Sequence, residues 1–185
     1  MLIAISGSQS AGKTTTLLKI KELGFPVIER KTSRSILSEW GITLSDISTN
    51  PELAIEFQQE ILKRKYNDEL EAVNSDEIYF GERTYGDLFT YNLLSLGSNN
   101  NYSDFINEYY KQCIKYQQQY YSVFYLKAGH FVPEKDGVRG FNVHYSRLAD
   151  IVMLDITTQM TKPGRLNVID TPCLEQRLAI ITSQV

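Results

Sequence analysis

Residues 7–14 read Gly7-Ser8-Gln9-Ser10-Ala11-Gly12-Lys13-Thr14 and match G-x-x-x-x-G-K-[ST], the pattern of the phosphate-binding P-loop. An apolar run at residues 1–5 precedes this stretch and predicts a buried strand, and residues 15–21 continue with the spacing of a helix. In a strand–loop–helix arrangement, backbone N–H groups can surround phosphate oxygens, and the helix N-terminus adds the positive end of its dipole. The sequence therefore predicts a nucleotide-binding site at residues 7–15.

Individual side chains of this loop have expected roles. Lys13 should reach the β- and γ-phosphates of a nucleotide, and the Thr14 hydroxyl should contact Mg²⁺. Thr15 completes the predicted phosphate site. ATP and Mg²⁺ are therefore the predicted cofactors.

Length and composition limit the class of protein. The 185 residues predict one domain, residues 1–185, and the net charge of −3 weakly disfavours avid, non-specific binding to nucleic acid. No apolar run approaches the roughly 20 residues of a membrane span, so no membrane association is expected. Met1 leads straight into the first strand without a secretory signal. We expect a cytoplasmic protein (host cytoplasm if viral) in which Cys113 and Cys173 are reduced.

Strands and helices alternate along the chain. Strands are expected at residues 2–6, 27–29, 77–81, 121–126 and 166–169, and helices at about 13–23, 33–40, 51–73, 86–96, 102–118, 143–160 and 173–181. This order predicts an α/β fold of three layers, a five-stranded parallel sheet with helices on both faces. Ligands of such sheets bind at the carboxyl ends of the strands, which is where the P-loop, Glu29 and Glu82 should meet.

The segment at residues 79–87 places Glu82 and Arg83 at the end of the third expected strand. Charges there are costly unless something binds them. The acid could hold Mg²⁺, and the arginine could stabilise charge on a transferring phosphoryl group. The alternative is a helix-capping salt bridge, with Asp87 serving only the helix N-terminus.

Glu29 follows the second expected strand and is the candidate general base, since it could accept the proton of an attacking hydroxyl. A surface residue paired with nearby cations is the alternative. A loop at about residues 129–141 suits a lid that brings Arg139 to the phosphates, with Arg147 joining from the following helix. A plain surface turn at Asp136-Gly137 is the alternative.

Phe57 and Gln58 lie on the long helix that begins after Pro51. An aromatic ring can stack on a base, and an amide can read a base edge. The alternative places Phe57 in the core and leaves the glutamine in solvent.

Four motifs together resemble P-loop kinases of the nucleoside and nucleotide kinase group. They are Val27-Ile28-Glu29 with Arg34, Pro51 to Phe57-Gln58, Glu82-Arg83-Thr84 with Asp87 and Tyr91, and Asp136-Gly137-Val138-Arg139. The chain is especially similar, over most of its length, to the AAA_28-like proteins, which include the ribosylnicotinamide-kinase domain and many phage proteins. That family usually has Asp where this chain has Glu82.

The resemblance implies roles for the matching residues. Glu82 would be the metal-associated acid and Arg83 the phosphate arginine. Glu29 would act on the acceptor side and Arg139 in the lid. The predicted substrate-binding residues are Arg34, Phe57, Gln58, Asp87 and Arg147.

The leading functional prediction is transfer of the γ-phosphoryl of ATP to a nucleoside or nucleoside monophosphate, with a thymidylate-like acceptor favoured. One alternative is a phage kinase acting on hydroxymethylated pyrimidine in DNA, which a basic groove could support. Its cations would be Lys63, Arg64, Lys65, Lys111 and Lys115. Two other functions stay open, a P-loop ATPase or switch without an acceptor and an inactive nucleotide-binding protein. A homodimer is also compatible with the sequence.

Overall fold

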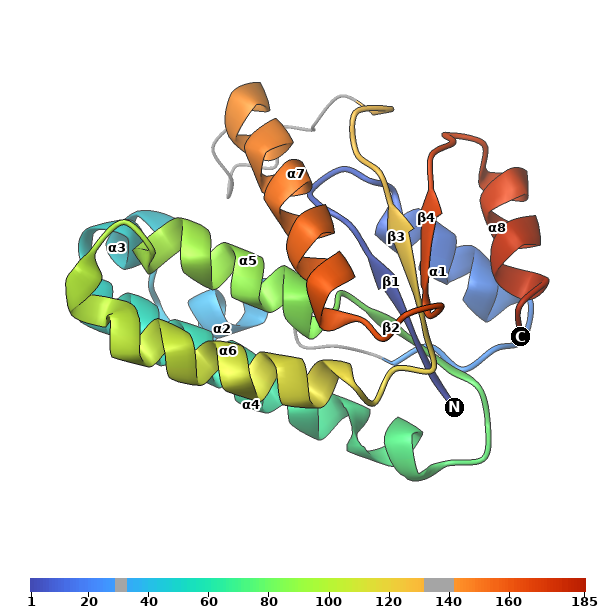
Figure 1. Ribbon diagram of the computed structural model, residues 1–185, viewed down its shortest axis with the longest axis horizontal. Helices are drawn as coiled ribbons and strands as arrows, with labels where there is room; N and C mark the ends of the chain where they lie inside the picture. The colour runs from blue at the N-terminus through green and yellow to red at the C-terminus, as the bar shows by residue number, and fades with distance from the viewer. Residues whose placement is uncertain (29–32, 132–141) are drawn as a thin grey trace.

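A parallel sheet of four strands forms the centre of the molecule (Figure 1). The structure is a computed structural model and describes residues 1–28, 33–131 and 142–185. The strands are β1 (Leu2–Ser6), β2 (Tyr79–Glu82), β3 (Ser122–Leu126) and β4 (Leu166–Ile169), in the order β2-β1-β3-β4. Neighbouring strands all pair in parallel, which confirms the predicted α/β class.

Of the predicted strand at residues 27–29, the described residues form only an isolated bridge at Val27, so the described part of the sheet has four strands and not five. Val27 lies opposite Phe80, with two backbone hydrogen bonds: Phe80 N donates to Pro26 O (2.9 Å) and Ile28 N donates to Phe80 O (2.8 Å). Pro26 has no N–H with which to extend the pairing toward the N-terminus. Glu29 lies outside the described residues.

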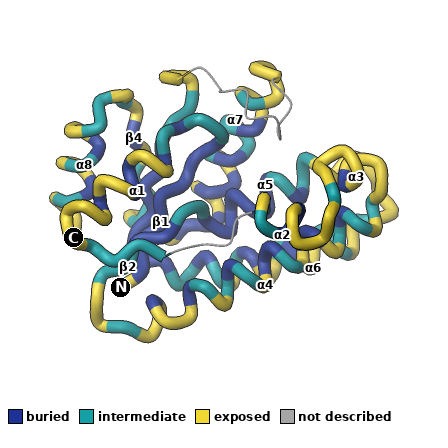
Figure 2. Tube along the Cα trace, turned by 180° about the vertical axis from the view of Figure 1, so that it is seen from behind, coloured by how far each residue is buried: buried dark blue, intermediate teal, exposed yellow. Residues whose placement is uncertain are grey.

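Helices cover both faces of the sheet (Figure 1). Side chains of a strand alternate between its faces, so Ile3 and Ile5 pack on one side while Leu2 and Ala4 pack on the other. The first cluster includes residues of α1 (Lys13–Glu22) and α8 (Leu174–Thr182). The second includes residues of α2 (Ser33–Trp40), α3 (Leu44–Thr49), α4 (Pro51–Asn74), α5 (Tyr85–Leu96), α6 (Ser103–Gln117) and α7 (Val143–Met160). Figure 2 shows the central strands as mostly buried between these layers.

Local capping signals set several helix ends. The Asn50 side chain accepts a hydrogen bond from Leu53 N (3.2 Å), and Pro51 occupies the first turn of α4, where its missing N–H costs nothing. The unpredicted helix α3 begins with a capping box between Thr43 and Asp46. A 3₁₀ turn, η1 (Asn100–Tyr102), leads into α6. Among the described residues, no helix is both long and apolar enough to cross a membrane.

Candidate active site

The P-loop joins the end of β1 to the start of α1, as the sequence predicts. Gly7 has φ +136°, and a β-carbon there would lie 2.4 Å from the backbone oxygen of Leu126. Gly12 has φ +86° and is the residue before α1. Both positions require glycine, because side chains rarely adopt these backbone angles and the space at Gly7 is already filled. Ser10, with φ 59°, completes the tight curve of the loop.

Lys13 is the first residue of α1 and is buried at the base of the loop. Its Nζ donates to the carbonyl oxygen of Ser8 across the loop (2.7 Å). Thr14 and Thr15 follow in the first turn of α1 and are exposed. The ammonium group and the helix N-terminus thus both lie at the loop, where they favour an anion.

Glu82 and Arg83 lie beside the strand that leads into this loop. Glu82 is the last residue of β2 and stands opposite Ile5, and the Arg83 N–H donates to Ile5 O (2.9 Å). Because Ile5 is two residues before Gly7, the pair and the P-loop share one end of the sheet. The strand register therefore brings together two motifs that are far apart in sequence.

Arg83 is held in an aromatic and acidic environment. Its Cζ lies 5.2 Å from the centre of the Tyr91 ring, and its Nη1 lies 3.8 Å from Asp87 Oδ2. Burial alone would lower the pKa of Arg83, but Tyr91, Asp87 and Glu82 together raise it above its usual value. The guanidinium therefore keeps its positive charge next to the P-loop.

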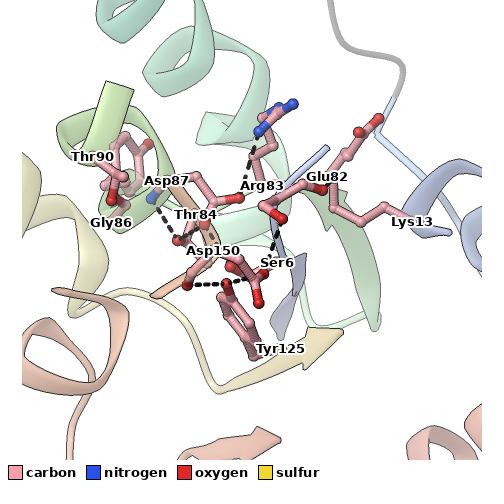
Figure 3. Close-up of polar contacts among 12 residues, drawn as sticks. Ser6, Lys13, Glu82, Arg83, Thr84, Gly86, Asp87, Thr90, Tyr125 and Asp150 are labelled. Carbon is pink, nitrogen blue, oxygen red and sulfur yellow. Dashed lines mark hydrogen bonds and ion pairs between the residues drawn. The ribbon is translucent and has the colours of Figure 1, made fainter. Parts of the chain in front are cut away.

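Asp87 forms hydrogen bonds through its carboxylate with Ser6 and Thr84 (Figure 3). It is fully buried and accepts hydrogen bonds from Ser6 Oγ and Thr84 Oγ1, the latter at 2.7 Å. Its own N–H donates to Thr84 Oγ1 at the start of α5 (3.1 Å). These contacts match the alternative interpretation of a helix-terminal acid, and a role of Asp87 in substrate binding stays a prediction.

A second aspartate, Asp150 on α7, contacts the P-loop and was not found from the sequence. Its Oδ1 accepts from Ser8 Oγ and from the Tyr125 hydroxyl, each at 2.9 Å. Burial, then the charges of Asp150 and Asp87, raise the pKa of Tyr125 well above its usual range, so the phenol stays a donor. Figure 3 shows Asp150 and Tyr125 close to Ser6 and Asp87.

Arg177 on α8 supports the P-loop from its other side. It is 2% exposed, and its guanidinium donates from Nη1 to Ala11 O (2.7 Å) and from Nε to Thr171 O (2.6 Å). The Phe131 ring centre lies 5.4 Å from its Cζ. A β-carbon at Gly12 would lie 2.5 Å from Nη1, so a side chain there would displace the guanidinium from this position. No local motif marks a residue that acts 166 positions away.

The other predicted acceptor residues are more scattered. Phe57 is buried on α4 against Trp40, with ring centres 6.2 Å apart, as its core interpretation expects. Gln58 is also buried rather than solvated. Arg34 on α2 and Arg147 on α7 are exposed. Glu29, Arg139 and most of the predicted lid lie outside the described residues.

The loop fits the predicted cofactors. The narrow glycine cradle and buried lysine suit the phosphates of a nucleotide, and the exposed Thr14 hydroxyl and the Glu82 carboxylate are oxygen ligands of the kind that Mg²⁺ prefers. Among the described residues, no group of three His, Cys, Asp or Glu side chains could hold a metal alone. Mg²⁺ sites commonly combine one or two protein oxygens with substrate phosphates, a composition that Thr14 and Glu82 would suit.

This strand, loop and helix, with an acid–arginine pair on the neighbouring strand, define the P-loop class of nucleotide-binding proteins. Within it, the chain belongs to the AAA_28 family of AAA domains, whose model matches residues 2–162. The predicted resemblance is thereby confirmed. No curated protein matches the sequence.

Solved structures share the fold at low sequence identity. Deoxyadenosine kinase from M. mycoides with bound dATP has a TM-score of 0.72 and 18% identity, with 100% of this chain and 98% of that chain covered. NadR protein in complex with NAD and AMP-PNP also has a TM-score of 0.72, with 13% identity, 98% of this chain and 48% of that chain covered. A second NadR structure, in complex with NR, has a TM-score of 0.72 and 15% identity, with 92% of this chain and 46% of that chain covered. This chain therefore spans about half of NadR.

Proposed function

We propose that this protein transfers the γ-phosphoryl group of ATP to a hydroxyl group of a nucleoside. The observation that carries the proposal is the junction of the P-loop with Glu82 and Arg83. Arg83 N donates a hydrogen bond to Ile5 O in β1, the strand that leads into the loop. Asp87 accepts a hydrogen bond from Ser6, the last residue of β1. Phosphoryl transfer depends on positioning and charge neutralisation, and this junction gathers the groups suited to both.

Each group has a distinct part in the proposed reaction. Backbone N–H groups of the P-loop and Lys13 would bind the phosphates, and Arg83 would stabilise negative charge on the transferring group. Thr14 and Glu82 would hold Mg²⁺, which neutralises phosphate charge when bound. Glu29 would accept the proton of the attacking hydroxyl, and Arg139 and Arg147 would approach the phosphates from the lid side.

A nucleoside acceptor is supported by the names of the structural neighbours, one a deoxyadenosine kinase and the other solved with NR. The thymidylate-like acceptor expected from the sequence shares the base and the sugar with a nucleoside, but its attacking atom would be a phosphate oxygen in place of a hydroxyl oxygen. Arg34 or Arg147 would be the cation for an acceptor phosphate, since both are exposed.

DNA as the acceptor has less support, because most charges of the expected basic groove are paired. Lys65 is buried against Glu69. Arg64 pairs with Glu39 (2.8 Å) and Glu60 (2.6 Å), and Lys111 pairs with Glu108 (3.5 Å). Neutralised cations release few counterions on DNA binding, so a strong electrostatic contribution is not expected here.

The test is transfer of label from γ-labelled ATP with Mg²⁺ to a panel of nucleosides, nucleoside monophosphates, ribosylnicotinamide and hydroxymethylated DNA. Label on a nucleoside supports the proposal and identifies the acceptor. Label on thymidylate or on DNA instead would replace the nucleoside with that acceptor. Release of free phosphate alone, independent of every acceptor, would contradict a kinase and favour an ATPase or switch.

A further inference from the structure

A buried lysine–glutamate pair lies against the turn that carries Glu82 and Arg83. Lys65 and Glu69 stand one helical turn apart on α4, with side chains 1% and 2% exposed and 2.5 Å between Nζ and Oε1. A buried ion pair often adds less stability than apolar residues of the same volume, because two charges must leave water. Stability alone therefore does not explain why charges occupy this position.

Glu69 fixes the pair in place. It accepts hydrogen bonds from the Tyr120 hydroxyl (3.0 Å) and from Gln119 Nε2 (3.2 Å). Its Oε1 also lies near Gly81 in β2, 3.3 Å from where a β-carbon would stand. The carboxylate is thus held beside β2 by groups outside α4, and it holds the lysine ammonium in turn.

Lys65 also donates hydrogen bonds to the backbone of the turn. Its Nζ donates to Arg83 O (2.9 Å) and, at 3.3 Å, to Glu82 O. On the opposite side, Arg83 N donates to Ile5 O (2.9 Å). The peptide groups before and after Arg83 are therefore tied to two different elements, β1 and α4.

Arg83 needs such support because its backbone is left-handed, with φ +65°. A β-carbon makes this conformation unfavourable, and it persists where the surroundings fix it. The same conformation ends β2 and sets the directions in which the Glu82 and Arg83 side chains leave the chain. Loss of the lysine would free the carbonyl groups and let both side chains reorient.

We propose that Lys65 is a positioning residue for phosphoryl transfer, which holds the Glu82–Arg83 turn in its left-handed conformation and so directs both side chains toward the nucleotide phosphates. Lys65 does not itself touch the substrate. The inference rests on the proposed function, because the Glu82 and Arg83 side chains bind Mg²⁺ and phosphates only in that reaction.

The test compares the double variant Lys65→Met with Glu69→Gln against the single variant Glu69→Gln. The double variant leaves no unpaired buried charge, and the single variant keeps the lysine bonds to both carbonyl groups. We expect kcat of the double variant to fall roughly 10–100-fold below that of Glu69→Gln, the range seen when outer-shell partners of a site are removed, with KM for ATP little changed. The amide of Arg83 should exchange its hydrogen faster in the double variant only.

Equal kcat in the two variants, each folded, would overturn the inference. If the double variant does not fold, Lys65→Leu with Glu69→Gln gives the same comparison, and its kcat must again fall below that of Glu69→Gln. If the wild-type protein transfers no phosphoryl group, the proposed function fails by itself, and the exchange rate of the Arg83 amide decides whether Lys65 holds the turn. Unchanged exchange in the double variant would show that it does not.

Discussion

Replacing Gly7 by alanine should damage both the fold and nucleotide binding, for a reason that can be worked out atom by atom. The new β-carbon would lie 2.4 Å from Leu126 O, well inside the 3.4 Å at which ordinary contact begins. Leu126 cannot move away easily, because β3 is paired on both sides, with Leu126 itself opposite Ile169. The backbone angle of φ +136° is a second obstacle, since side chains rarely adopt it.

Two contributions add up in this variant. Backbone strain at such an angle costs about 1–3 kcal/mol, and forcing an extra carbon into a filled space costs about 1–3 kcal/mol more. Gly7→Ala should therefore lower the free energy of unfolding by about 2–6 kcal/mol, a large share of the roughly 5–15 kcal/mol typical of a folded protein.

Gly24→Ala is the matched control, because Gly24 has φ +94° and open space around it. It should show the strain contribution alone, with normal ATP affinity. Urea unfolding followed by circular dichroism gives both free energies, and ATP titration gives the affinities. Equal destabilisation in the two variants, or normal ATP binding by folded Gly7→Ala, would refute the steric argument for Gly7.

Three further predictions concern single side chains. Lys13→Ala should abolish phosphoryl transfer in a folded protein, because it removes the buried ammonium from the P-loop; near wild-type turnover would exclude the P-loop assignment. Glu29→Gln should lower kcat with little change in ATP affinity, and an unchanged rate would remove Glu29 from the mechanism. The Thr43 hydroxyl and then the Thr43 amide lower the pKa of Asp46 in the folded state, so its ionised form stabilises the protein above about pH 4 and this contribution disappears as the pH falls. The stabilities of wild type and Asp46→Asn, measured by thermal unfolding, should therefore differ at pH 6 and converge in acid; a constant difference would contradict this.

Much of the fold could be predicted from local patterns. The helix at 143–160 and the strand at 166–169 match in full, since hydrophobic spacing and caps specify them. Helix α3 has six residues and is too short to show a periodicity, although Thr43 and Asp46 form a recognisable cap. Of the strand expected at 27–29, the described residues form only an isolated bridge at Val27, since an apolar run does not determine how its backbone pairs.

The site was only half predictable, for a related reason. The P-loop and the Glu82–Arg83 pair are contiguous motifs, whereas Asp150 meets Ser8 across 142 positions. Lys65 lies four residues after Ile61 and four before Glu69, on the buried face of α4, and this spacing is its sequence signal. From the sequence alone, charged residues at such spacing predict a solvent-exposed helix face. Only the tertiary structure shows which buried groups they contact.

The most direct test of the central claim is the fraction of γ-phosphoryl lost from ATP that is recovered on a nucleoside acceptor, measured for wild type and for Lys13→Ala. We expect nearly full recovery as nucleoside monophosphate in the wild type and no transfer in the variant. ATP loss that yields only free phosphate, at the same rate with and without nucleoside, would contradict it.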